Sequence, residues 1–252
     1  MSSSVHLIGG GWEPAFAVAV YGPFLQEAAI VAARGGRPGK PIIACVVLDE
    51  GAGREQFGRW AGVLREVASC EPVPVLMSVG APLDVSELGN ADGLLVCGGL
   101  TPGYAAGMAS GAAEVLDWLL LGDRPYAGFS AGSAIAPESA LVGGWRSGGV
   151  PICSDDAAED LDELTVQPGL GLVSFTVDVH CAQWGTLPRL IEAVRLRSGL
   201  TGVGIDENTA LIVGPDGAVV AGRGQVWLAA GSRNGTVEVT PFRAGHTVPV
   251  PE

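Results

Sequence analysis

Short apolar segments alternate with segments of helical period through the first half of the chain. Residues 54–70 place apolar side chains three and four positions apart, and residues 105–121 also have a helical period. Several of the short segments are apolar at nearly every position, which is typical of strands in a sheet that is covered on both faces. The alternation therefore predicts an α/β fold with a mostly parallel sheet flanked by helices. The strands expected from it are residues 5–8, 41–48, 73–79, 93–96 and 126–129.

The pattern changes after residue 200. Short alternating segments at 210–213, 218–221 and 225–228 are separated by runs rich in Gly, Pro and Asp, which predicts a C-terminal β-hairpin or meander. Residues 241–252 lack such a pattern, and an irregular tail is expected there. With 252 residues and 48% hydrophobic content, the chain can bury one large core, so we expect a single domain over residues 1–252.

Charge and cysteine content disfavour several classes of partner. The chain has 27 acidic residues against 14 basic ones, a formal net charge of −13, which opposes binding to nucleic acid or to an anionic membrane surface. The five cysteines show no paired spacing, so we expect neither a zinc cluster nor a disulfide framework. The N-terminus lacks the pattern of a secretory signal, and no uninterrupted apolar stretch reaches about 18 residues. These features predict a cytoplasmic protein.

Residues 154–163 hold six carboxylates and few apolar anchors. Such a charge run is typical of an exposed surface segment. The alternative is a mobile cover over a site.

One segment carries the clearest chemical signal. The strand expected at residues 126–129 leads through Gly128-Phe129-Ser130-Ala131-Gly132 into the small-residue start of a helix. A serine on such a sharp strand-to-helix turn exposes its hydroxyl at the sheet edge, and glycines on both sides avoid collisions with the crossing backbone. The segment predicts a nucleophile elbow with Ser130 as the nucleophile of a serine hydrolase. The alternative for Ser130 is a helix N-cap.

A serine hydrolase also needs backbone N–H donors for the oxyanion that forms at the attacked carbonyl. Ala131 directly follows the serine and offers one. The strand expected at residues 93–96 runs into Gly98-Gly99, and a glycine pair there can turn a second N–H toward the same point. We therefore expect the oxyanion hole at Gly99 and Ala131, a tight turn being the alternative for the glycines.

The general base is sought among only three histidines. His6 lies in the first expected strand and His246 in the tail, whereas His180 ends an apolar segment at the edge where sites of such sheets form. His180 is therefore the expected base. The acid that orients it has three candidates near this edge, which are Asp178, Asp206 and Glu207.

Three ordered motifs follow one another along the second half of the chain. They are Gly128-Phe129-Ser130-Ala131-Gly132-Ser133, then Gly169-Leu170-Gly171-Leu172 leading to Asp178-Val179-His180, then Gly204-Ile205-Asp206-Glu207-Asn208-Thr209-Ala210-Leu211. Over roughly residues 90–230 the chain thus resembles the cyanophycinase and dipeptidase E family of serine peptidases. The resemblance implies a flavodoxin-like fold of the class I glutamine amidotransferase type, with serine in place of the amidotransferase cysteine. It also implies a Ser-His-Glu triad, which by position is Ser130, His180 and Glu207.

The chain departs from that family's pattern around the expected base. Cyanophycinases tend to have a glutamine at Val179 and then a series of arginines, of which only Arg189 is kept here, while Trp184 and Thr186 are neutral. Leu100-Thr101 also replaces an Asp-Gln pair. The resemblance therefore implies the reaction class and leaves the substrate open. We expect Asp178 and Trp184, both near the base, to contact the substrate.

These residues predict hydrolysis of a peptide, isopeptide or related amide bond in a small substrate through an acyl-enzyme on Ser130. We expect no metal and no organic cofactor, and a homodimer is an allowed assembly. Two alternatives stay open. One is an amide- or ester-processing enzyme of specialised metabolism on the same scaffold, and the other is a noncatalytic binding or regulatory domain.

Overall fold

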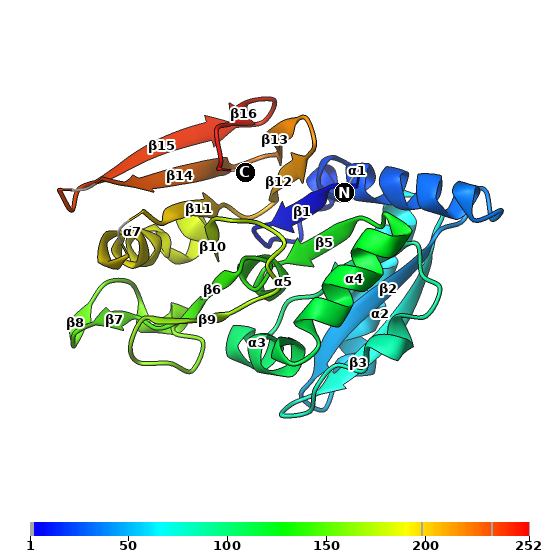
Figure 1. The fold of residues 1–252 in the computed structure, drawn as a ribbon, viewed down its shortest axis with the longest axis horizontal. Helices are drawn as coiled ribbons and strands as arrows, with labels where there is room; N and C mark the ends of the chain where they lie inside the picture. Colours follow the sequence, from blue (N-terminus) through cyan, green and yellow to red (C-terminus); the bar gives the residue numbers. More distant parts are fainter. Residues whose placement is uncertain (1–2, 198, 233, 252) are drawn as a thin grey trace.

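The computed structural model describes residues 3–197, 199–232 and 234–251, and its main feature is a mixed eight-stranded sheet (Figure 1). Five strands pair in parallel, namely β1 (Val5–Ile8), β2 (Ile42–Asp49), β3 (Glu71–Ser78), β4 (Gly93–Val96) and β5 (Tyr126–Phe129). Three antiparallel strands extend the sheet beyond β1, namely β12 (Thr209–Gly214), β13 (Gly217–Gly222) and β16 (Thr247–Val248). The order is β16-β13-β12-β1-β5-β4-β2-β3. The predicted mostly parallel α/β sheet is confirmed.

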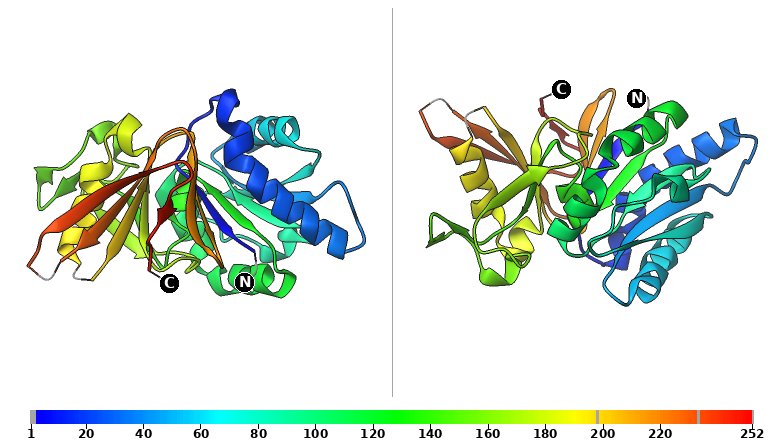
Figure 2. Two further views of the ribbon diagram at one scale, coloured as in Figure 1. Left: turned by 90° about the horizontal axis from the view of Figure 1, so that it is seen from above. Right: turned by 60° about the horizontal axis from the view of Figure 1, so that its bottom comes forward.

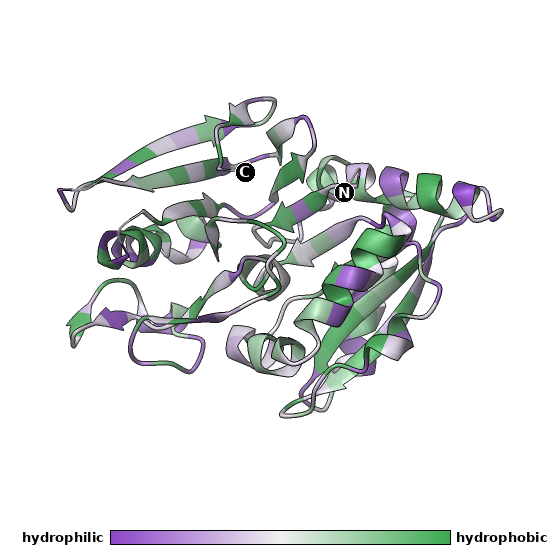
Figure 3. Cartoon of the chain, in the orientation of Figure 1, coloured by the Kyte–Doolittle hydropathy of each residue, from purple (hydrophilic) through white to green (hydrophobic). Residues whose placement is uncertain are grey.

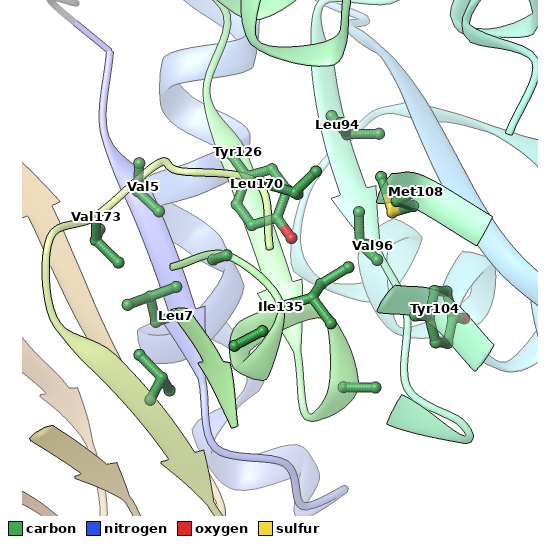
Figure 4. Packing of buried hydrophobic residues seen from close by; sticks show 14 of the residues in the cluster. Val5, Leu7, Leu94, Val96, Tyr104, Met108, Tyr126, Ile135, Leu170 and Val173 are labelled. Atoms are coloured by element: carbon green, nitrogen blue, oxygen red, sulfur yellow. The ribbon is translucent and has the colours of Figure 1, made fainter. Parts of the chain in front are cut away.

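Helices cover both faces of this sheet because successive strand side chains point to opposite sides. In β2, Cys45 and Val47 pack toward α1 (Pro14–Arg34) and α2 (Gly53–Val67), whereas the alternate residues of the strand belong to the core of the other face. That second core is shown in Figure 4. It lies under α3 (Thr101–Ala109), α4 (Ala112–Gly122) and α5 (Ala131–Ala134).

The hydropathy of the chain follows these layers. Hydrophobic residues are concentrated on the strands of the central sheet, and hydrophilic residues are concentrated on connecting segments and outer helix faces (Figure 3).

The helix expected at residues 105–121 is in fact two helices, α3 and α4, because the chain breaks at Ser110 and Gly111. Both residue types have weak helix propensity, glycine especially, so the period continues across a turn that the pattern does not reveal.

α1 has no counterpart among the elements expected from the sequence. It is 21 residues long, and by length and composition alone it is apolar enough to cross a membrane, a test that core helices of soluble proteins also pass. One face of α1 packs against the central sheet. The buried residues of that face are Val20, Tyr21, Phe24, Leu25, Ala28 and Ala32.

The C-terminal part forms a second sheet beside the first (Figure 2). Its four strands, in the order β10-β11-β14-β15, are β10 (Thr176–Val179), β11 (Thr201–Ile205), β14 (Gln225–Gly231) and β15 (Val237–Arg243). The predicted hairpin is present as β12–β13 in the first sheet. The next strand, β14, does not extend this hairpin and instead pairs with β11 in the second sheet. The tail expected to be irregular, residues 241–252, contains the last three residues of β15 and all of β16. α7 (Leu187–Leu196) packs on this sheet.

Short elements complete the fold. Two small antiparallel pairs are formed by β6 (Ser139–Gly143) with β9 (Thr165–Pro168) and by β7 (Arg146–Ser147) with β8 (Val150–Pro151). The remaining single-turn elements are η1 (Val85–Leu88), η2 (Asp155–Ala157) and α6 (Cys181–Trp184).

Candidate active site

Ser130 lies in the turn between β5 and α5, at the carboxyl end of the parallel strands. Its backbone has φ 53° and ψ −108°, a region that non-glycine residues rarely occupy and that costs roughly 1–3 kcal/mol. The turn is held by Ser133, whose hydroxyl donates to Gly128 O at 2.6 Å and accepts from Ile8 N at 2.7 Å. The strain at Ser130 is thus maintained by the structure around it.

The glycines beside Ser130 allow the backbone to cross closely, as the sequence predicts. A Cβ at Gly128 would lie 2.4 Å from the carbonyl carbon of Gly132, and a Cβ at Gly132 would lie 2.2 Å from Val96 O. No real Cβ tolerates such contacts, so both positions require glycine. The expected steric reason for this pattern is confirmed.

The structure brings together Ser130, His180 and Glu207. The Ser130 Oγ lies 2.8 Å from His180 Nε2, and His180 Nδ1 lies 2.8 Å from Glu207 Oε1. The three residues follow three different strands, β5, β10 and β11. This arrangement can move a proton from the serine hydroxyl to the imidazole while the carboxylate holds the opposite ring nitrogen.

His180 is only 5% exposed, and this burial dominates its titration. Burial lowers the pKa of the imidazole below its ordinary value of 6.5, while the hydrogen bond and charge of Glu207 oppose that shift. The neutral ring, which is the form that accepts a proton, therefore persists to a lower pH than in an exposed histidine.

Three consecutive glycines after β1 join the two sheets at this site. Gly9 O accepts from His180 N at 3.0 Å, and Gly10 O accepts from Asn208 N at 2.7 Å. Gly10 has φ +104°, and a Cβ there would lie 2.0 Å from the His180 Cε1. None of the motifs identified in the sequence included these glycines. The signal that could have found them is the run Gly9-Gly10-Gly11 directly after the first predicted strand.

We expect Gly10→Ala to lower turnover by about 10²-fold or more, because the added methyl group would displace the imidazole from Ser130 and Glu207. Gly39→Ala is the matched control, since Gly39 has a similar φ of +95° and open space around its Cβ position. Kinetics and circular dichroism on both purified variants check this. Equal activity in the two variants would show that contact with Gly10 does not position His180.

Asp206 and Glu207 are adjacent but point to different partners. Asp206 is 3% exposed and accepts from the N–H groups of Ala182 at 3.1 Å and Gln225 at 2.9 Å and from Trp227 Nε1 at 2.9 Å. Glu207 reaches His180, and its own N–H donates to Gln183 Oε1 at 2.8 Å. Of the three candidate acids, the structure therefore places Glu207 against the imidazole.

Asp178, expected to contact substrate, lies elsewhere. It is 1% exposed and forms a bidentate ion pair with Arg189, with distances of 2.7 and 2.9 Å. Arg189 also donates to Ala157 O beside the acidic segment. Asp178 is two residues before His180 and is therefore near the site. Its carboxylate, however, is buried and paired with Arg189, so it does not face the cavity. A substrate-contact role for Asp178 does not fit this position.

The two expected oxyanion donors are both close to Ser130, one through the cavity and one along the chain. Gly99 lines one cavity with Ser130, and Ala131 directly follows Ser130. Among the residues that the structure describes, the N–H groups of Gly99 and Ala131 donate to no protein acceptor. An oxyanion donor must lack a protein acceptor, so this observation is compatible with the expected oxyanion hole, which stays a prediction.

An open cavity of about 560 Å³ gives access to Ser130 and His180. The acidic segment is mostly exposed, as expected, and residues between positions 155 and 160 also line this cavity. Glu159 accepts from Thr101 N at 2.9 Å, and Arg189 holds the segment through Ala157. Aromatic side chains also line the cavity, and the Cζ atom of Arg59 lies 3.8 Å from the ring centre of one of them, Trp12. The lining residues include Trp12, Arg59, Trp60, Phe129, Asp155, Asp156, Glu159, Asp160 and Trp184.

Comparison with known proteins places this geometry in context. No family model matches the chain. Two cyanophycinases, from Trichormus variabilis and a Nostoc species, are each 31% identical over 186 residues, which is 73% of this chain and 54% of theirs. A crystal structure named as a peptidase E protein from Listeria monocytogenes EGD-e matches with a TM-score of 0.54 and 14% identity, covering 88% of this chain and 98% of that one. The chain is cyanophycinase-like in sequence and peptidase E-like in fold.

This cyanophycinase-like chain spans about half the length of the curated relatives that it matches. The structural match shows the fold, and the sequence matches support the family that the three motifs indicate. The resemblance expected from the sequence is thus confirmed.

Proposed function

We propose that the chain is a serine peptidase or amidohydrolase that cleaves a peptide, isopeptide or related amide bond in a small substrate. The observation that carries this proposal is the continuous contact from Ser130 Oγ through His180 to Glu207, with both distances at 2.8 Å. The cyanophycinase relatives and the peptidase E-like fold support the same class of reaction.

In the proposed mechanism, Ser130 Oγ attacks the substrate carbonyl carbon while His180 Nε2 takes the hydroxyl proton. The carbonyl oxygen becomes an oxyanion, which the N–H groups of Gly99 and Ala131 stabilise. His180 then gives its proton to the leaving amine as the C–N bond breaks, which leaves an acyl group on Ser130. Water, deprotonated by His180, attacks this ester and releases the acid and the free serine.

A library of dipeptides and isoaspartyl dipeptides tests the proposal by release of free amino groups. His180→Ala serves as the blank, because it removes the base and leaves Ser130 in place. We expect at least one substrate to be hydrolysed by the wild type and by no more than background in the variant. Equal hydrolysis by both proteins would contradict the proposal, as would activity that EDTA removes and a divalent ion restores.

We expect β-aspartyl-arginine dipeptides to be poor substrates, with kcat/KM below about 10⁴ M⁻¹s⁻¹, the low end for ordinary enzymes. A free carboxylate on the acyl side needs a basic partner. The described lining residues of the cavity include four acidic side chains against one guanidinium, Arg59. Thr186, at one of the positions where the family is basic, is buried and donates to Val179 O at 2.7 Å.

β-Alanyl-arginine is the matched comparison for this prediction, since it has the same leaving amine and β-linkage and lacks the acyl-side carboxylate. Kinetics on both dipeptides and on the β-aspartyl-arginine polymer provide the measurement. Efficient cleavage of β-aspartyl-arginine above the stated value would show that the cavity accepts the carboxylate.

A further inference from the structure

Trp184 lies flat on the imidazole of His180. The two ring centres are 3.8 Å apart and the ring planes differ by 5°. Trp184 ends α6, one helical turn after His180, and its N–H donates to His180 O at 2.8 Å. Trp184 is 44% exposed, so it is not a core residue and its contact with His180 is not explained by burial in the core.

Gly10 contacts the imidazole as well. A Cβ at Gly10 would lie 2.0–2.8 Å from three atoms of the His180 ring, so only a glycine backbone fits there. The ring is therefore enclosed by Trp184 and Gly10, while its two nitrogens are directed to Ser130 and Glu207. Contacts with the ring surface and with both nitrogens together fix the orientation of the imidazole.

We propose that Trp184 is a positioning residue that stabilises the His180 imidazolium formed when Ser130 loses its proton. The inference rests on the proposed function, and it goes beyond the substrate contact expected for Trp184 from the sequence. Tryptophan presents the most electron-rich ring face among the side chains, and a cation within about 6 Å of its centre is attracted to it. The neutral imidazole gains less from this contact than the imidazolium does. The stacking thus favours the state that His180 reaches during the reaction.

Charged groups from several elements also act on His180. Glu207, after β11, favours the imidazolium through its hydrogen bond and charge, and Asp178 in β10 favours it through charge. Arg189 in α7 opposes it, and burial opposes it more strongly. The acidic wall of the cavity, from Asp155 to Asp160, faces the same open space. A variant that isolates the indole must therefore leave these groups and the cover over the ring unchanged.

Trp184→Phe and Trp184→Leu form the matched pair. Phenylalanine keeps an aromatic face over the ring, whereas leucine keeps an apolar cover without one. We expect Trp184→Phe to retain kcat within about threefold and to keep the acid limb of kcat/KM. We expect Trp184→Leu to lose about tenfold in kcat and to move that limb down by about half a pH unit, because the imidazolium has lost its partner.

The pKa of His180 can also be measured by NMR without any substrate, since the chain has only three histidines to assign. A lower His180 pKa in the leucine variant than in the phenylalanine variant would support the inference even if no substrate were known. Equal pKa values in the two folded variants would overturn it. A change confined to KM would also overturn it and make Trp184 a substrate contact. Failure of the proposed function would instead appear as absence of turnover in the wild type.

Discussion

Replacing Ser130 with alanine should reduce turnover by about 10⁴-fold or more and leave the fold intact. Within the part of the chain that the structure describes, the hydroxyl has one hydrogen-bond partner, His180 Nε2. Its removal therefore takes away the atom that forms the acyl-enzyme without opening a cavity in the core. Turnover on one substrate and the melting temperature provide the measurement.

Ser133 provides the opposite control three residues later. Its hydroxyl is fully buried and bonds to Ile8 N, Ile8 O and Gly128 O, so Ser133→Ala should lower stability by about 1–3 kcal/mol. We expect the folded fraction of that variant to keep far more activity than Ser130→Ala. A Ser130→Ala protein that retained a tenth of wild-type turnover would show that Ser130 is not the nucleophile.

Glu207→Gln should lower kcat by roughly 10³- to 10⁴-fold, the scale seen when a triad acid is neutralised. The Glu207 carboxylate accepts a hydrogen bond of 2.8 Å from His180 Nδ1–H, which leaves Nε2 unprotonated and able to accept the proton of Ser130. An amide can donate to Nδ1 instead and so place the ring proton on Nε2. In that tautomer His180 cannot act as the base.

Asp206→Asn is the matched control for Glu207→Gln, because it removes one charge from the neighbouring residue. The three hydrogen bonds that the Asp206 carboxylate makes within the described residues all come from N–H donors, so an amide NH₂ group facing one of them loses a hydrogen bond. We expect a loss of stability of about 1–3 kcal/mol and less than a tenfold change in kcat of the folded protein. If Asp206→Asn lost more turnover than Glu207→Gln, with both shown to be folded, the acid would be Asp206.

Local features of the sequence were sufficient to predict the parallel strands and the sharp turn from β5 into α5 at Ser130. A strand such as β4 is apolar at nearly every position because helices cover both of its faces, and this pattern is visible without a structure. Gly128 and Gly132 are required by contacts that are local or that lie between neighbouring strands. A Cβ at Gly128 would collide with Gly132, and a Cβ at Gly132 would collide with Val96 at the end of β4. The choice of Glu207 rather than Asp206 as the acid came from the family resemblance. The alternation of side chains along a strand could not decide between them, because it is easily lost where a strand ends.

Features that depend on distant partners could not be predicted. Nothing within residues 225–231 reveals that β14 pairs with β11 rather than with β13. The role of Gly10 depends on His180, which is 170 positions later in the chain. Asp178 was placed near the site by its strand face, but its ion pair with Arg189 depends on how α7 docks. Trp184 is only four residues after His180, but its stacking on the imidazole depends on the single helical turn of α6, which the sequence pattern did not predict.

The most direct test of the central claim is labelling with a fluorophosphonate probe, followed by mass spectrometry of the digested protein. The probe reacts with a serine that a neighbouring base has activated, so its use requires no knowledge of the substrate. We expect one adduct per chain on the peptide that contains Ser130, no adduct in Ser130→Ala, and slower labelling in Glu207→Gln. A folded wild-type protein that gave no adduct, or an adduct at another residue, would contradict the assignment of Ser130 as an activated nucleophile.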